Sequence, residues 1–339
     1  MHVFVTGATG FIGFHTVRAL LAQGHSVRLG VRNVAKMRAL YSAAGIAVSD
    51  YVEGEITDRD AIAAALEGCD AVVHTAAMVS LDANRADQMY QTNVIGTQVV
   101  IGTAIDKGIR SIVHVSSAAA LYDPFASTLD ESLPLARPTS AYGRSKSDSD
   151  QFVRDRIAEG APVAITYPCT VLGPDDPAMS EGNQGLAIFF NRTFLHTSSG
   201  MQMIDVRDLA QVHVALLEGG KRGPYLVAGH YRSWPELGQT LDRVTGRTLH
   251  KLPVPAWVLR MLGAAVDQLG KVFPVDTIVT GEAVNYATRW VYADDRKVRN
   301  ELDFSYRPLE QTLADTVRWL AAAGHVESYW ATLLPESES

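Results

Sequence analysis

Hydrophobic and polar positions alternate along the first half of the chain in a regular rhythm of strands and helices. An apolar run at residues 3–5 leads into a glycine-rich turn, after which apolar residues recur at helical spacing through residue 22. Further apolar runs predict strands at 26–32, 48–52, 71–77 and 112–117, and helical periodicity separates them, most extensively at 88–107. This alternation implies parallel strands joined by right-handed crossovers. We therefore expect an α/β fold with a doubly wound parallel sheet.

The second half of the chain is less regular. Residues 174–184 are polar and rich in turn residues, whereas residues 185–194 are apolar. A helix is predicted at 205–217, with Asp205 or Asp208 as its N-cap. Apolar side chains then recur at three- and four-residue spacing through 254–269. This stripe indicates a helix packed on the rest of the protein, with a lid over an apolar substrate or a membrane-touching helix as the alternatives.

Composition narrows the function classes. With 339 residues the chain is long enough for one large domain or two interleaved ones. A net charge of −7, without a run of Lys and Arg, argues against a nucleic-acid partner. Cys69 and Cys169 are too few for a disulfide framework, and Asp175 and Asp176 lack further metal ligands nearby, so we expect a reducing compartment and no metal. Without an export signal or an apolar run of about 18 residues, we expect a cytoplasmic protein with no spanning segment.

The glycine-rich turn at residues 7–13 joins the first strand to the first helix. In such a turn, Gly7 permits the tight bend, Gly10 lets a pyrophosphate approach the backbone, and Gly13 lets the helix pack close to the sheet. The helix N-terminus then offers unpaired N–H groups and a positive dipole end to phosphates. The pattern predicts a dinucleotide site, with a plain strand-to-helix turn as the alternative.

The end of the second strand bears on which dinucleotide is bound. An acidic residue there accepts hydrogen bonds from the 2′-hydroxyl of NAD, and a cation favours the 2′-phosphate of NADP. This region carries Arg28, Arg32 and Lys36, with Val31 where an acid is expected. NADP(H) is therefore favoured over NAD(H), unless the cations are simply a solvated basic cluster.

The remaining strands end in residues suited to a ligand. The strand at 71–77 ends in small residues, which allow a flat ring to lie against the backbone, and the strand at 112–117 ends in two serines. Ligands in parallel sheets bind beyond the carboxyl ends of the strands. The glycine turn, Arg32, Ala76 and Ser117 all fall there, so four segments are predicted to converge on one crevice.

Tyr142 and Lys146 open a helix predicted through Arg156. They are four residues apart and therefore share one helix face. A nearby ammonium favours the tyrosine anion and lowers the phenol pKa from its usual value of about 10. The pair is a candidate acid/base, although this spacing also occurs by chance on helix surfaces.

Together these residues resemble the extended short-chain dehydrogenase/reductase family, also called the NAD-dependent epimerase/dehydratase family. The resemblance spans nearly the whole chain and implies a Rossmann-type domain with a smaller, interleaved C-terminal substrate domain. The motifs that carry it are Thr6–Gly13, Val73–Ala77, Asn93–Thr97, Ser116–Ser117, Tyr142–Lys146, Pro168 with Gly173–Pro174, and Asp205–Ala210. The implied division is a nucleotide-binding domain at 1–174, rejoined by 201–230, and a substrate domain at 175–200 and 231–335.

The resemblance also implies residue roles. Tyr142 is the general acid/base, Lys146 lowers its pKa and holds the nicotinamide ribose, and Ser117 hydrogen-bonds the substrate oxygen. The serine position is counted from the strand, because counting back from Tyr122 gives Ala118. The implied cofactor-binding residues are Gly7, Thr9, Gly10, Phe11, Ile12, Gly13, Arg32, Lys36, Glu55, Ile56, Thr75, Ala76, Ala77, Asn93, Tyr142, Lys146, Pro168 and Val171. The implied substrate-pocket residues are Met78, Val79, Tyr122, Phe189 and Phe190.

Three features choose a branch of this family. Sugar-nucleotide dehydratases carry a Thr-Asp-Glu set after the fifth strand, where this chain has Ser116-Ser117-Ala118. Sugar epimerases usually carry an asparagine within the segment equivalent to 166–170, and none is present. Pro168 and the segments 171–174 and 27–32 resemble instead the dihydroflavonol-reductase and 3β-hydroxysteroid-dehydrogenase-like branch.

The expected activity is NADP(H)-dependent hydride transfer to or from an apolar or aromatic ketone, aldehyde or secondary alcohol. Two alternatives stay open: a nucleotide-sugar epimerase with tightly bound NAD(P), and a non-catalytic NADP-binding regulator. The resemblance further implies a homodimer, formed by the helices at 88–107 and 142–156.

Overall fold

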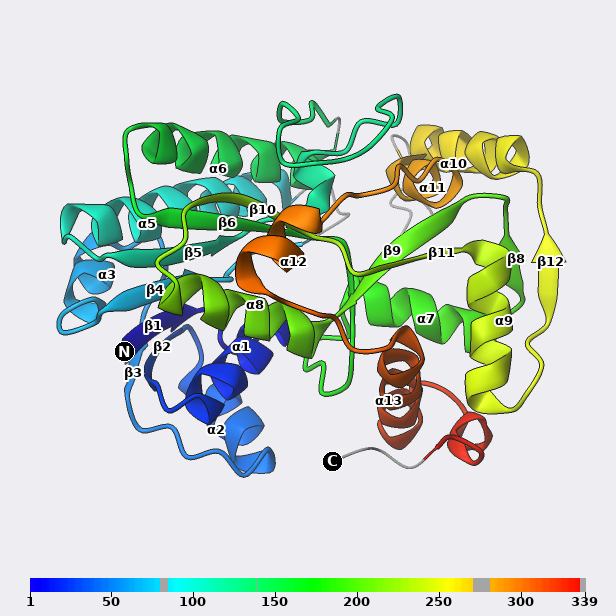
Figure 1. Cartoon of the computed structure of the whole chain (residues 1–339), viewed down its shortest axis with the longest axis horizontal. Helices are drawn as coiled ribbons and strands as arrows, with labels where there is room; N and C mark the ends of the chain where they lie inside the picture. The colour runs from blue at the N-terminus through cyan, green and yellow to red at the C-terminus, as the bar shows by residue number, and fades with distance from the viewer. Residues whose placement is uncertain (80–84, 139, 271–280, 336–339) are drawn as a thin grey trace.

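A seven-stranded parallel sheet forms the centre of the computed structural model, which describes residues 1–79, 85–138, 140–270 and 281–335 (Figure 1). Its strands are β1 (His2–Thr6), β2 (Ser26–Val31), β3 (Tyr51–Glu53), β4 (Ala71–His74), β5 (Ser111–Val115), β6 (Val163–Pro168) and β10 (Gly223–Val227). Their order is β10-β6-β5-β4-β1-β2-β3, and every neighbouring pair is parallel. The predicted doubly wound sheet is confirmed. Its order reverses between β1 and β4, which places a crevice at their carboxyl ends.

Helices cover both faces of this sheet. One face is covered by α1 (Phe11–Ala22), α2 (Val34–Ala43) and α8 (Val206–Glu218), and the other by α3 (Arg59–Ala65), α5 (Gly96–Asp106) and α6 (Ala141–Ala158) (Figure 1). Successive side chains of a strand point to opposite faces, so Val3 and Val5 enter one core while Phe4 enters the other. Burial on both faces explains why these strands are continuous apolar runs in the sequence.

The long helix predicted at 88–107 contains a wider turn. It consists of α4 (Ala86–Tyr90), a π-helical turn η2 (Gln91–Ile95) and α5. A π turn inserts one extra residue into the helix and reorients the side chains around it. Asn93 lies in this turn.

Much of the second half of the chain forms a second group of elements, drawn at the right of Figure 1. A three-stranded sheet contains β7 (Thr170–Leu172), β9 (Gly200–Asp205) and β11 (His230–Ser233), and β8 (Phe194–His196) pairs with β12 (Lys251–Pro253). The helices α7 (Glu181–Asn191), α9 (Trp234–Thr245) and α13 (Leu309–Ala322) pack around a third core. Within 201–230, β9 joins the smaller sheet whereas α8 and β10 belong to the larger sheet's layers.

Besides α10, which is described below, four shorter elements are present in the described residues. They are η3 (Ala118–Ala120), α11 (Gly281–Thr288), α12 (Arg296–Leu302) and η4 (Ser328–Ala331). Of the substrate-domain range predicted at 231–335, residues 271–280 lie outside the described residues.

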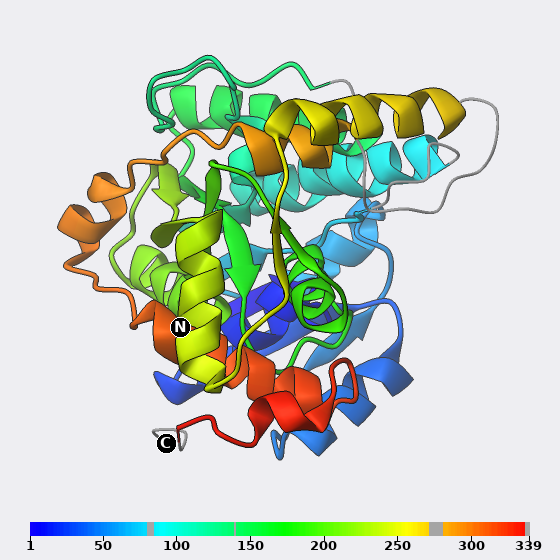
Figure 2. The same ribbon diagram turned by 90° about the vertical axis from the view of Figure 1, so that its right-hand side faces the viewer.

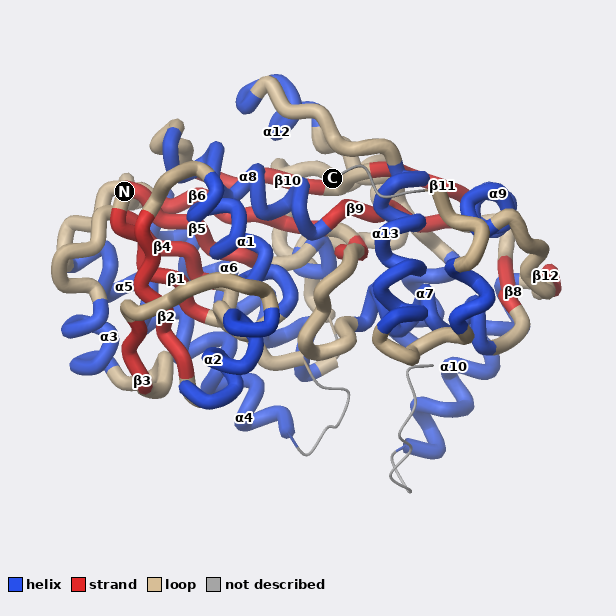
Figure 3. The backbone as a smooth tube through the Cα atoms, turned by 90° about the horizontal axis from the view of Figure 1, so that it is seen from below, coloured by secondary structure: helices blue, strands red, loops and turns tan. Residues whose placement is uncertain are grey.

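The apolar stripe at 254–269 forms α10 (Ala256–Gly270), which is packed on one side only. Gly263 faces α11, where an added Cβ would lie 3.1 Å from Val284 Cγ2. The side chains of Trp257, Met261 and Leu262 are 60%, 64% and 55% exposed. Figure 2 shows α10 in yellow at the edge of the molecule, and in Figure 3 it projects away from the sheets. The side chains of 267–270, including that of Leu269, lie outside the described set.

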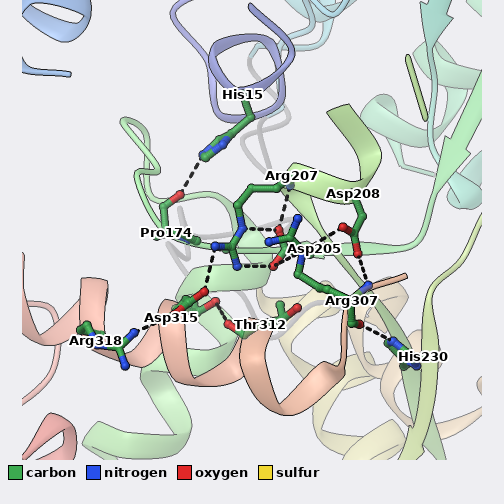
Figure 4. Close-up of polar contacts among 12 residues, drawn as sticks. His15, Pro174, Asp205, Arg207, Asp208, His230, Arg307, Thr312, Asp315 and Arg318 are labelled. Carbon is green, nitrogen blue, oxygen red and sulfur yellow. Dashed lines mark hydrogen bonds and ion pairs between the residues drawn. The ribbon is translucent and has the colours of Figure 1, made fainter. Parts of the chain in front are cut away.

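Ion pairs join the two groups of elements (Figure 4). Asp205 is the N-cap of α8, as predicted, and accepts from the Arg207 backbone N–H at 2.8 Å. The Arg207 guanidinium contacts both Asp205 and Asp315 of α13, the latter at 2.8 Å. Arg307 lies 2.8 Å from Asp208. The motif at 205–210 therefore holds the start of α8 against α13.

Candidate active site

The turn between β1 and α1 leaves no room for side chains at two of its glycines. Gly7 has φ +72°, and an added Cβ would lie 2.5 Å from Thr75 Oγ1 and 2.6 Å from the Ala76 nitrogen. A Cβ on Gly13 would lie 2.3 Å from the Gly7 carbonyl oxygen. These contacts are far below van der Waals distance, so the close approach of helix, turn and β4 requires glycine at both positions.

The N-terminus of α1 is open toward the crevice. Gly10 is its N-cap, and no side chain from the described residues caps the helix. Unpaired N–H groups at a helix N-terminus bind phosphates. Thr9 and Ile12 are partly exposed beside it, while Phe11 is buried. The turn, the open N-terminus and the small residues Ala76 and Ala77 after β4 fit a dinucleotide.

The basic residues near β2 divide into two groups. Arg28 is used within the protein: its Nε lies 2.8 Å from Asp50 Oδ1, and its Nη1 donates to the carbonyls of Ala65 and Glu67. Arg28 therefore braces the edge of the sheet and does not belong to the basic cluster predicted there. Arg32 and Lys36 are exposed at the end of β2 and the start of α2, and neither has an ion-pair partner in the part of the chain that is described.

Tyr142 and Lys146 occupy the first two turns of α6. Ser140 caps this helix by accepting from the Gly143 N–H at 3.0 Å, and a Cβ on Gly143 would lie 2.5 Å from Pro138 Cβ. Tyr142 is partly exposed, whereas Lys146 is buried with its Nζ 3.4 Å from the Val115 carbonyl oxygen. Burial lowers the pKa of Lys146 from 10.5 to about 8.

Ser117 lies at the end of β5, where η3 packs against α6. Its Oγ accepts from the Ala119 N–H at 3.2 Å, which fixes the oxygen and leaves the hydroxyl proton available to a ligand. Ser117 is partly exposed, whereas Ser116 and Ala118 are buried. Of these three consecutive residues, Ser117 is therefore the one whose side chain is accessible.

Asn93 lies in the π turn and is bonded within the protein. Its Oδ1 accepts from the Met78 N–H at 2.7 Å, and its Nδ2 donates to the Met78 carbonyl at 2.9 Å and to Ser145 Oγ at 2.9 Å. Asn93 therefore ties the segment after β4 to α6 next to Lys146. Sequence reasoning placed Asn93 at the cofactor and missed this bridging role, because hydrophobic periodicity does not reveal a π turn.

The other predicted cofactor residues differ in exposure. Thr75 donates its hydroxyl proton to the Thr6 carbonyl at 2.8 Å. Ile56 is buried and packs under Gly96 of α5, so its side chain belongs to the core. Pro168 is buried, Val171 is partly buried and Glu55 is exposed.

The five predicted substrate residues do not form one surface. Met78 is partly buried, and Val79 is 48% exposed. The Tyr122 ring packs against that of Tyr286 of α11 with centroids 4.2 Å apart and the planes tilted by 45°. Its hydroxyl donates to the Arg289 carbonyl at 2.8 Å, and burial raises its pKa to about 12.

The two phenylalanines, Phe189 and Phe190, belong to the third core, around α7, α9 and α13. Phe189 packs edge-on against Phe194 at 4.3 Å, and Phe190 is buried against Trp330 at 5.0 Å. Both contacts are core contacts, which follow from the helical spacing of α7.

Three buried ionisable residues lie behind Lys146: Asp150, His114 and His74. Sequence reasoning gave none of them a role. The available signal was the four-residue spacing from Lys146 to Asp150, which continues the face shared by Tyr142 and Lys146. Within the described ranges no group of three or more His, Cys, Asp or Glu is arranged to hold a metal. Among the same residues, no helix combines the length and apolarity needed to cross a bilayer.

Comparisons with known proteins identify the family of this chain. The family model described as "NAD dependent epimerase/dehydratase family" matches residues 3–229. A protein of Synechocystis sp. named "Putative dihydroflavonol 4-reductase" is 30% identical over 334 residues, covering 96% of each chain. A "4-hydroxy-2-methyl-3-oxo-4-farnesyl-3,4-dihydroquinoline-1-oxide ketoreductase" of Stigmatella aurantiaca is 28% identical, covering 96% of this chain and 98% of the relative. The crystal structure of gox2253 has a TM-score of 0.79 at 26% identity, covering 96% of this chain and 99% of that one.

Proposed function

The chain belongs to the NAD dependent epimerase/dehydratase family and is an NAD(P)-dependent oxidoreductase of the extended short-chain type; from this premise we propose that it is an NADP(H)-dependent carbonyl reductase. Its substrate is a small apolar or aromatic ketone or aldehyde, or the corresponding alcohol in reverse. The observation that carries this proposal is the placement of Tyr142 and Lys146 on one face of α6, which packs against η3 where Ser117 begins it.

The residues divide the work of carbonyl reduction. NADPH, when bound, supplies the hydride from its nicotinamide ring. Ser117 donates its free hydroxyl proton in a hydrogen bond to the carbonyl oxygen, and so stabilises the negative charge that develops there. Tyr142 gives its phenolic proton to that oxygen, and the Lys146 ammonium makes this transfer easier by lowering the phenol pKa.

Arg32 and Lys36 support the preference for NADP(H). Both cations are exposed at the end of β2, and neither is neutralised by a described acidic side chain. A 2′-phosphate placed there gains charge-assisted hydrogen bonds. Because Arg28 is bonded within the protein, Arg32 and Lys36 are the proposed determinants of the preference for NADP(H).

The names of the relatives support the proposed substrate class. One denotes a dihydroflavonol reductase and the other a ketoreductase of a farnesylated dihydroquinoline oxide, so both denote reduction of a ring compound. In this chain Met78, Val79 and Tyr122 supply apolar surface near the start of α6. We propose these three as the substrate-facing residues.

We further propose a homodimer in which α4, α5 and α6 meet their copies, since α5 and α6 lie side by side on one outer face of the sheet (Figure 1). The division into a nucleotide-binding domain at 1–174 and 201–230 and a substrate domain in the remainder is part of the same proposal. The unpaired, buried Cys69 and Cys169 support a cytoplasmic location.

The experiment is to follow the loss of NADPH, and separately NADH, absorbance when purified protein meets a panel of aromatic, steroidal and aliphatic ketones and aldehydes. Turnover with NADPH that is lost in Tyr142→Phe is the expected result. Silence across the panel with cofactor retained through purification contradicts the proposal and supports an epimerase. Cellular function that survives Tyr142→Phe supports a regulatory NADP-binding protein instead.

A further inference from the structure

A group of buried ionisable side chains lies behind Lys146, and the mechanism above does not use it. Asp150 follows Lys146 by about one turn of α6 and is fully buried. His114 of β5 is also buried, with its Nε2 3.6 Å from Asp150 Oδ1. Apart from this contact and a hydrogen bond between the Tyr167 hydroxyl and Asp150, neither the Asp150 carboxylate nor the His114 ring has a hydrogen-bond partner among the described residues.

This arrangement needs an electrostatic explanation. An isolated buried charge is strongly unfavourable, so buried charges in proteins are paired. Lys146 is buried as well, and the negative charge of Asp150 raises the Lys146 pKa against the larger lowering effect of burial. Residues four apart share a helix face, so the ammonium and the carboxylate lie on the same side of α6.

His74 and His114 are neutral rings at the end of this group away from Tyr142. They stack with centroids 5.5 Å apart, and the His74 nitrogens lie 2.7 Å from Thr6 Oγ1 and 3.1 Å from Thr97 Oγ1. Burial lowers the pKa of both histidines. With both rings neutral, Asp150 is the balancing negative charge for Lys146, and His114 is placed to donate toward it.

Among the described residues, the nearest other charge is Arg154, which follows Asp150 by four residues on α6, is partly buried and has a buried Nη2 without a hydrogen-bond partner. From β6, Tyr167 faces Asp150, and burial raises its pKa. Arg154 of α6 donates to the Tyr167 hydroxyl at 3.1 Å. Asp87 and Tyr90 of α4 and Asp106 of α5 are exposed, and η2 and η3 contain no ionisable residue.

We propose that Asp150, supported by His114, is the buried counter-charge of Lys146 and thereby sets the pH at which Tyr142 exchanges its proton. Both are positioning residues, since they act through Lys146 and not on the substrate. This inference rests on the proposed function for its catalytic meaning, but its electrostatic content concerns this chain's own residues alone.

The test is a pH titration of tyrosinate absorbance that needs neither cofactor nor substrate. Subtracting the titration curve of Tyr142→Phe from that of the wild type gives the titration of Tyr142 alone. The same subtraction is made for proteins that also carry Asp150→Asn. Without the counter-charge Lys146 loses its proton at lower pH and no longer favours the Tyr142 anion. The Tyr142 midpoint should therefore rise by about one pH unit or more.

Asp148→Asn is the matched control, because Asp148 lies on the same helix but is exposed. It should leave the midpoint unchanged. His114→Gln should raise the midpoint by a smaller amount, and it serves as the second variant if Asp150→Asn does not give a wild-type circular dichroism spectrum. A folded Asp150→Asn or His114→Gln protein with the wild-type midpoint, or an equal shift in Asp148→Asn, overturns the inference.

Turnover assays on the same proteins keep the two proposals separate. If wild type reduces no carbonyl but Asp150→Asn still shifts the Tyr142 midpoint, the proposed function fails and the counter-charge stands. If wild type turns over and its pH–rate profile is unchanged in a folded Asp150→Asn protein, the reductase stands and the counter-charge fails.

Discussion

The carboxyl edge of the seven-stranded sheet is tightly packed, whereas the outer face of α10 is exposed. At the sheet edge a Cβ on Gly13 would lie 2.3 Å from a carbonyl oxygen, and Asn93 is held by bonds to Met78 and Ser145. On α10, Trp257 and Met261 are 60% and 64% exposed. The candidate cofactor site thus lies where packing is tight, and the exposed apolar surface of α10 lies where packing is one-sided.

The largest expected effect comes from breaking the tight region. Gly13→Ala should weaken NADPH binding at least about 100-fold, or roughly 3 kcal/mol, because the added Cβ pushes α1 from the turn. Alanine has a higher helix propensity than glycine, so a loss of NADPH affinity cannot be caused by a less stable helix. Isothermal titration calorimetry measures the affinity for NADPH. Gly185→Ala in α7, which meets nothing within 4 Å, is the control. Wild-type affinity in Gly13→Ala would contradict the proposed cofactor site.

A second prediction concerns the two free cations. Replacing Arg32 and Lys36 together by Ala should lower the NADPH-over-NADH ratio of kcat/KM by about 30- to 900-fold, because each of the two lost charge-assisted contacts contributes about 1–2 kcal/mol. Arg110→Ala, at another exposed arginine, controls for net charge. An unchanged ratio would place the 2′-phosphate elsewhere.

The third prediction follows from the burial of Lys146. Carbonyl reduction needs Tyr142 protonated beside a charged Lys146, and the pKa of Lys146 is lowered to about 8. Reduction should therefore be constant below pH ~8 and fall about tenfold per unit above it, as the pair loses a proton. The measurement is kcat/KM against pH. A flat profile up to pH ~10 would mean that the pair does not titrate as described.

The smallest expected effect compares the two regions directly. Tyr122→Ala should raise KM for an aromatic ketone about fivefold with kcat nearly unchanged, because an aromatic contact contributes about 1 kcal/mol. Trp257→Ala on the outer face of α10 should change neither constant more than about twofold. If Trp257→Ala changed KM or kcat more than Tyr122→Ala did, α10 would be part of the substrate site.

Local rules explain what the sequence predicts well. The sheet, the glycine turn and the Asp205 cap each depend on residues close in sequence, so their patterns are visible there. Long-range contacts explain the rest. The pairing of Arg28 with Asp50, the bridge from Asn93 to Ser145 and the burial of Phe190 against Trp330 join segments 22, 52 and 140 residues apart, a separation that no local pattern encodes.

The central claim is net hydride transfer from NADPH to a carbonyl carbon. The most direct measurement incubates the protein with NADPH deuterated at C4, in both stereoisomers, together with each carbonyl compound that it consumes, and determines product mass. The account predicts one deuterium per alcohol from one stereoisomer only, with NADP⁺ formed in equal amount. Product free of deuterium from both stereoisomers, with no net NADP⁺, would contradict it and indicate redox chemistry that begins and ends on one substrate.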